Sequence, residues 1–197
     1  ALAAVSPTGT IIVNDGDYST ENIVLADDVT LQLTDTVGPV QIGDVGAGQT
    51  NSIVLTGSNT LETGATNLNG PGINCAITGS GNITKLGSGL LVVREVNTYT
   101  GTTTVLGGLF RVGQNGALSL QSELAGDGPV VVTDPGRIEF NVILDATINQ
   151  TGVISGTGSV VGSIATAESM LRRFMPEEQV SGILEGLKNT ERESAMW

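Results

Sequence analysis

The feature that most limits how this chain can fold is a continuous alternation of short strands and tight turns between Thr8 and about Ala165. Apolar or Thr-rich pieces of about three to six residues alternate with Gly, Asn, Asp and Ser. Such pieces predict short β-strands, and no 3.6-residue helical periodicity competes with them. Examples are residues 10–13, 23–25, 29–33, 52–55, 90–93, 102–105, 109–112, 130–133, 138–140 and 159–164.

Short strands at close spacing are compatible with a sandwich, a barrel or a solenoid. The cores of sandwiches usually contain large aromatic anchors, but aromatic residues make up only 3% of this chain. The stretches 79–83 and 156–160 also share the pattern Gly-x-Gly-x-β-branched, and internal repeats indicate stacking. The sequence therefore favours an all-β solenoid.

The net charge of −12 is distributed unevenly along the chain. Residues 1–84 contain eight Asp and Glu residues and no Lys or Arg, so that Lys85 is the first basic residue. An acidic surface repels phosphate, so neither nucleic acid nor an anionic membrane surface is an expected partner. No apolar run approaches the roughly 20 residues of a membrane-spanning helix, and we expect no direct membrane insertion of this segment.

The cysteine and histidine content restricts the possible chemistry. The chain has one cysteine, Cys75, and no histidine. It can therefore form no internal disulfide, cysteine–histidine zinc site or cysteine–histidine catalytic pair. We expect Cys75 to be a small buried apolar residue, and we expect no cofactor.

Residues 79–113 read GSGNITKLGSGLLVVREVNTYTGTTTVLGGLFRVG. In fixed order they contain a glycine pair, a Thr-Lys step, a second glycine pair, an apolar strand, an Asn-Thr-Tyr-Thr-Gly turn, a Thr-rich strand and a final apolar strand. This order resembles the passenger-associated transport repeat of bacterial autotransporters and related surface proteins. The resemblance depends on Gly79, Gly81, Thr84, Lys85, Gly87, Gly89, Asn97, Thr98, Tyr99, Thr100, Gly101 and Gly108.

The resemblance implies a right-handed parallel β-helix on an exported bacterial protein, and it implies no catalytic activity. The expected domain organisation is a parallel β-helix over residues 1–166 and a short C-terminal helical element over residues 167–197. The expected location is the bacterial cell surface or the extracellular medium.

Backbone preferences predict roles for the motif residues. Sharp corners require positive φ angles, which glycine adopts without steric cost. Asn97 is expected at a corner with its amide bonded to backbone, and Tyr99 is expected to cover the edge of a coil. An alternative is that Asn97, Thr98 and Tyr99 bind a sugar. The glycines expected to have positive φ are Gly79, Gly81, Gly87, Gly89 and Gly101.

Acidic parallel β-helices include enzymes that act on polysaccharides, so paired carboxylates require attention. The candidate pairs are Asp15 with Asp17 and Asp27 with Asp28. Lyases usually add a basic group that neutralises a uronate, and the acidic half of this chain has none. We interpret these residues as turn aspartates. Calcium at Asp15-Gly16-Asp17 stays an alternative, although neither an EF-hand nor a nonapeptide repeat is present.

The last 31 residues differ in composition, because they hold all three methionines, the only tryptophan and half of the basic residues. Apolar residues recur there at helical spacing, and Pro176 with two following acids indicates a helix start. The apolar face is expected either to cap the last coil or to dock on another chain. It consists of Leu171, Phe174, Val180, Ile183, Leu184 and Leu187.

Several functions are compatible with these features. The leading one is a non-enzymatic, surface-displayed or secreted solenoid that acts as an adhesin or structural spacer and binds a host or bacterial surface ligand. A second is a subunit that binds copies of itself in an extracellular head-to-tail fibre. A polysaccharide-active enzyme and a trimeric spike or other receptor-binding module are the remaining alternatives, because fold alone does not define function.

Overall fold

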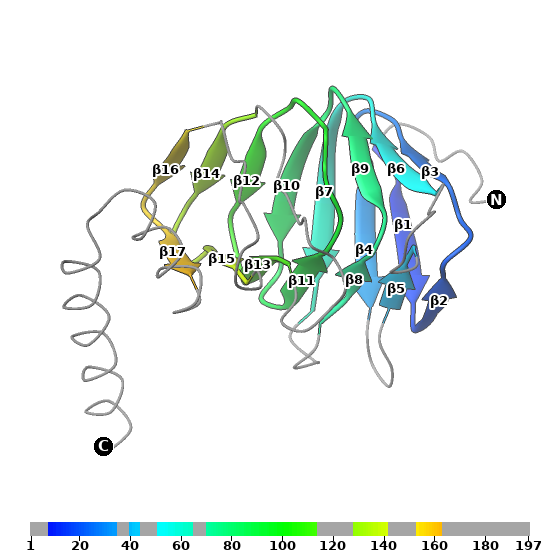
Figure 1. Ribbon diagram of the computed structural model, residues 1–197, viewed down its shortest axis with the longest axis horizontal. Helices are drawn as coiled ribbons and strands as arrows, with labels where there is room; N and C mark the ends of the chain where they lie inside the picture. The colour runs from blue at the N-terminus through cyan, green and yellow to red at the C-terminus, as the bar shows by residue number, and fades with distance from the viewer. Residues whose placement is uncertain are drawn as a thin grey trace, which may run out of the picture.

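The computed structural model describes residues 8–34, 40–43, 51–64, 70–113, 128–141 and 153–162, which form seventeen strands in three sheets. Figure 1 shows the strands stacked side by side along one axis. Sheet A has the order β1-β4-β7-β10-β12-β14-β16. Its strands are Thr10–Asn14, Thr30–Thr34, Ser58–Thr63, Asn82–Leu86, Thr103–Val105, Val130–Val132 and Ile154–Gly156.

Sheets B and C form the other two walls. Sheet B has the order β17-β15-β13-β11-β8-β5-β2. In chain order from β2 to β17, its strands are Gly16–Tyr18, Val40–Ile42, Gly72–Ile73, Leu90–Val93, Leu109–Val112, Arg137–Phe140 and Ser159–Gly162. Sheet C, of order β3-β6-β9, contains Ile23–Leu25, Ser52–Leu55 and Ala76–Gly79.

The chain passes from sheet A to sheet B, and in the first three turns also through sheet C, before it returns to sheet A one layer further on. Every strand pairing among the described residues is parallel. The body is therefore a parallel β-solenoid, as the sequence predicts, and the sandwich and barrel alternatives are wrong.

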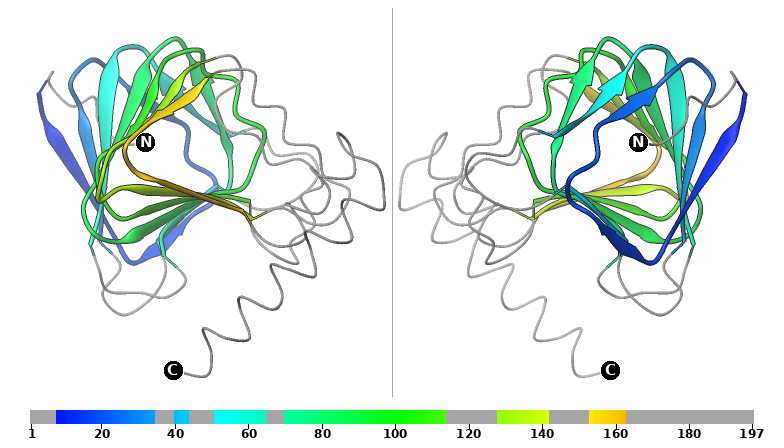
Figure 2. Two further views of the ribbon diagram at one scale, coloured as in Figure 1. Left: turned by 90° about the vertical axis from the view of Figure 1, so that its left-hand side faces the viewer. Right: turned by 90° about the vertical axis from the view of Figure 1, so that its right-hand side faces the viewer.

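Figure 2 looks along this stack and shows the strands around one interior. Side chains of the strands alternate between this interior and the outer surface. In β4, for example, Leu31 and Leu33 are buried and Thr30, Gln32 and Thr34 are half-buried. Because the strands are in register, inward residues of successive turns form columns of medium-sized aliphatic side chains. Right-handedness stays a prediction, and the predicted helical tail lies outside the described residues.

The predicted corner glycines divide into two groups. Gly79 and Gly87 have φ angles of 102° and 78°, as the sequence predicts. Gly81, Gly89 and Gly101 do not have positive φ, so this part of the prediction is wrong.

Close approach of stacked corners explains these three glycines. A Cβ on Gly101 would lie 2.1 Å from the carbonyl oxygen of Gly81 in the preceding turn. A Cβ on Gly81 would in turn lie 2.4 Å from the carbonyl oxygen of Gly57. Glycine is needed at this corner because the backbones of successive turns nearly touch.

We expect Gly101→Ala to lower the free energy of unfolding by about 1–3 kcal/mol, because the new methyl group overpacks the corner. Gly64→Ala is the matched control, since no other atom of the described residues lies within 4 Å of a Cβ built on Gly64. Its effect should stay within about 0.5 kcal/mol. Urea denaturation of both variants measures the difference, and equal midpoints would contradict the close stacking of corners.

Candidate functional site

The motif at residues 79–113 begins at the end of β9 and continues through β10, β11, β12 and β13. It therefore occupies two successive turns, with β10 paired to β12 and β11 paired to β13. Figure 1 shows these strands in the middle of the stack. The motif therefore forms the central part of the described stack.

Lys85 lies in an inward column between Leu61 and Val105 and is completely buried. Its Nζ donates hydrogen bonds to the carbonyl oxygens of Leu86, Gly87 and Gly107, at 2.6, 3.2 and 3.2 Å. A buried ammonium group needs such acceptors, because it has lost its hydration shell. Lys85 therefore links the corner of its own turn to the corner of the next one.

Burial lowers the pKa of Lys85 from 10.5 to about 8, and the negative charge of Glu62 partly opposes this shift. At neutral pH the side chain is still mainly protonated. All three of its hydrogen-bond donors are then available to the three carbonyl groups.

Asn97 is buried at the corner that follows β11. Its Oδ1 accepts a hydrogen bond from the backbone N–H of Ile77 at 3.0 Å, and its Nδ2 donates to the carbonyl oxygen of Glu95 at 3.0 Å. This is the backbone-bonding role that the sequence predicts. Thr98 and Thr100 donate their backbone N–H groups to Ile77 and Gly79, and so extend the pairing of sheet C by one turn.

Tyr99 is part of the hydrophobic core and is fully buried. The prediction that it covers a coil edge is therefore wrong. Its hydroxyl shares a hydrogen bond of 2.5 Å with Oγ1 of Thr103, and burial raises the pKa of the phenol above its usual value. The core accepts a tyrosine here because Thr103 provides a polar partner within it. With Asn97 and Tyr99 both buried, the sugar-binding alternative keeps only Thr98 as an exposed side chain.

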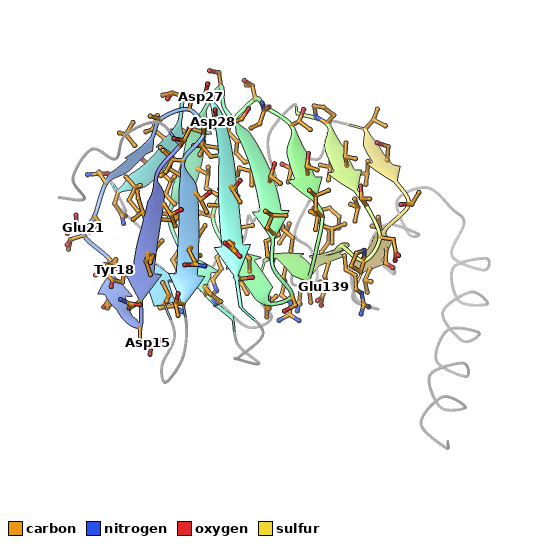
Figure 3. All side chains as sticks on the ribbon, turned by 180° about the vertical axis from the view of Figure 1, so that it is seen from behind. Asp15, Tyr18, Glu21, Asp27, Asp28 and Glu139 are labelled. Carbon is orange, nitrogen blue, oxygen red and sulfur yellow. The ribbon has the colours of Figure 1, made fainter. Side chains whose placement is uncertain are left out.

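Figure 3 shows Asp15, of the first candidate carboxylate pair, at a different corner of the solenoid from Asp27 and Asp28. Asp17 accepts a hydrogen bond from the backbone N–H of Ser19 at 2.9 Å, and Asp27 accepts one from that of Ser58 at 2.7 Å. Asp28 has a positive φ of 58°. The Asp17 contact lies within one turn of the backbone, whereas the Asp27 contact joins its corner to the corner of the next layer at Ser58. Among the described residues, no group of three potential metal-binding side chains is present.

Sequence reasoning did not identify a polar cluster on sheet B. Arg94 donates hydrogen bonds to the side-chain oxygens of Asn74 and Gln41, and Asn74 Nδ2 donates to Gln41 Oε1 at 2.7 Å. The guanidinium lies over Gly72, since a Cβ there would be 2.1 Å from its Nη1. Burial and the nearby charge of Arg111 lower the pKa of Arg94. The cluster connects three successive turns.

Sequence reasoning also missed a column of threonines on the outer face of sheet A. Threonine occupies the same register position in five successive turns and is exposed or half-buried in each. One feature of the sequence could have revealed the column: each of these threonines follows a polar residue by two positions. The column presents hydroxyl and methyl groups at a spacing of about 4.8 Å. It consists of Thr10, Thr30, Thr60, Thr84 and Thr104.

The remaining sequence predictions have different outcomes. Cys75 is buried, as predicted, and burial together with the charge of Glu95 raises its pKa to about 11. The predicted tail residues Leu171, Phe174 and Val180, with Ile183, Leu184 and Leu187, all lie outside the described residues.

Comparison of the chain with protein-family models, curated proteins and solved structures gives no match. The parallel strand pairings define the chain as a parallel β-solenoid. The resemblance to the passenger-associated transport repeat depends on residues 79–113 alone. Within the described ranges no helix is long and apolar enough to cross a membrane.

We expect Lys85→Met to lower the free energy of unfolding by about 1–3 kcal/mol, because three carbonyl groups lose a hydrogen-bond donor. Thr104→Met is the control, since Thr104 is half-buried on the outer face of the next strand. Chemical denaturation at pH 7 measures both variants. An unchanged midpoint for Lys85→Met would show that the ammonium group does not stabilise the stacked corners.

The pKa of Lys85 also predicts a pH dependence. The group has a lower pKa in the folded chain (about 8) than in the unfolded chain (10.5). Between these values the unfolded chain binds more protons, so the contribution of Lys85 to stability rises with pH. The difference in denaturation midpoint between wild type and Lys85→Met should therefore widen from pH 7 to pH 10. A narrowing difference would mean that the carbonyl groups hold the ammonium more tightly than burial disfavours it.

Proposed function

We propose that this chain is a non-enzymatic β-solenoid of the autotransporter-passenger type, secreted or displayed at a bacterial surface, where it acts as an adhesin or structural spacer. The proposal depends mainly on the structural role of the motif at residues 79–113, which is to join successive turns. Its distinctive residues Lys85, Asn97 and Gly101 connect one turn to the next. A motif that organises stacking suits a protein whose useful property is a rigid shape.

The outer surface supports an adhesive or spacer role better than a catalytic one. The threonine column of sheet A offers neutral hydroxyl and methyl groups to a ligand along five turns. Asp17 and Asp27, by contrast, are engaged with backbone N–H groups in turns. The surface ligand would be a host or bacterial component that contacts an extended face.

Two alternatives remain open. A fibre subunit is favoured by the two unlike ends of the solenoid, which both expose apolar side chains. A polysaccharide-active enzyme would need Asp27 or Asp28 to act as acid or base. Release of product from pectin or another uronate polymer, lost on Asp27→Asn, would support the enzyme and contradict our proposal.

The location of the protein tests the proposal directly. We expect an antibody against the purified chain to label intact cells of the organism that makes it, or to detect the protein in the medium. Treatment of intact cells with proteinase K should remove the cell-bound signal, whereas a periplasmic control protein should survive. A signal found only after cell lysis would contradict the proposed location.

A further inference from the structure

The end of the solenoid formed by β16 and β17 exposes part of the interior. Val160 of β17 continues an inward column that contains Phe110 and Ile138. Phe110 and Ile138 are fully buried, whereas Val160 is 55% exposed. Ile154 of β16 is likewise more exposed than its buried partner Val130. The last described turn thus presents apolar side chains and two edge strands.

The opposite end is formed by β1 and β2, the terminal strands of the same two sheets. Their inward residues Ile11 and Tyr18 are half-buried, whereas the partners of these residues in the next turn, Leu31 and Ile42, are fully buried. Both ends therefore have apolar surface between strand edges. Unpaired strand edges are sites at which a further strand can be added.

The charges of the two ends differ. Figure 3 shows Asp15 and Glu21 beside Tyr18 at the β1–β2 end. The described residues of 8–64 include six acids and no Lys or Arg, whereas those of 70–162 include four basic and three acidic residues. Two β1–β2 ends repel each other through their acids, whereas exposed Arg137, which pairs with Ser159 of β17, offers a positive charge to the acidic end of another copy.

We propose that the β16–β17 end binds the β1–β2 end of a second copy of this chain, head to tail. All strands are parallel, so β1 of the second copy continues sheet A after β16 with the same direction, and β2 continues sheet B after β17. Ile154 and Val160 then become buried beneath the first turn of the second copy, whose inward residues include Ile11 and Tyr18. Such a heterologous contact leaves one free end on each side, so it generates filaments rather than closed dimers. The inference deepens the fibre alternative, and it holds or fails independently of the adhesin or spacer role.

The first test compares the wild-type chain with Val160→Asp. Sedimentation and electron microscopy of the full chain should show filaments that lengthen with protein concentration. Val160→Asp places a charge in the buried contact and should weaken association by about tenfold or more. Leu106→Asp is the control, since Leu106 is 40% exposed on the side wall, away from both ends. The control chain should assemble like wild type.

A second variant blocks the other end. The backbone N–H of Thr30 donates to the carbonyl oxygen of Gly9, so alternation along β1 directs the N–H of Ile12 away from β4. Ile12→Pro removes that N–H from the free edge while the pairing with β4 is retained. Each blocked variant alone should stay monomeric at the lowest concentration at which the wild-type chain forms filaments. A mixture of Ile12→Pro and Val160→Asp should stop at dimers, because one intact end of each type remains.

Any of three results would overturn the head-to-tail contact. A wild-type chain that stays monomeric at high concentration excludes the contact. Wild-type dimers that do not grow, together with dimers of Ile12→Pro alone, would indicate that two β16–β17 ends meet instead. Assembly by Val160→Asp equal to wild type would place the contact elsewhere. Thermal unfolding followed by circular dichroism checks that both variants keep the β-rich fold.

Discussion

The close contact between the backbones of successive turns is the constraint on which the rest of this structure depends. Parallel strands of neighbouring turns lie about 4.8 Å apart and are joined by backbone hydrogen bonds. The corners must follow with the same spacing. At the corner of Gly57, Gly81 and Gly101 the carbonyl oxygen of one turn occupies the space that a Cβ of the next would need. Gly81 and Gly101 are therefore required by the spacing of the turns.

The same constraint explains the polar groups in the interior. Corners leave carbonyl and N–H groups that the strand ladders do not satisfy, and a buried unsatisfied group costs about 1–3 kcal/mol. Lys85 supplies donors to three such carbonyl groups, and Asn97 bonds to one N–H and one carbonyl group. Tyr99 in turn pairs its hydroxyl with Thr103. The recognisable motif is therefore a set of connections between turns.

The sequence predicts the solenoid well, because strand-forming pieces and glycine turns alternate over most of its length. Strands with many polar residues, such as β7 with the sequence SNTLET, are harder to recognise. Their outward positions carry Ser, Thr and Glu, and even the inward Asn59 is polar. Strand recognition by apolar content fails there, whereas register with the neighbouring strands β4 and β10 defines the pairing.

Side-chain roles that depend on a neighbouring turn could not be predicted from one sequence. Gly101 is needed because of Gly81, which lies 20 residues earlier, and Arg94 lies over Gly72. The steps between aligned residues vary, since Thr10 pairs with Thr30 but Thr30 pairs with Thr60. This variation hides the threonine column and the contacts of Arg94 from a search for a fixed repeat.

Disulfide formation between neighbouring turns tests the in-register stack most directly. In a Cys75→Ala chain, Thr84→Cys with Thr104→Cys places thiols on paired residues of β10 and β12. Their Cα atoms should lie about 4.8 Å apart, within the range of a disulfide. The offset pair Thr84→Cys with Leu106→Cys should be about 8 Å apart, beyond that range. Mild oxidation should cross-link the first pair and leave the second as free thiols. Equal cross-linking of both pairs, or of neither, would contradict the stacked parallel register.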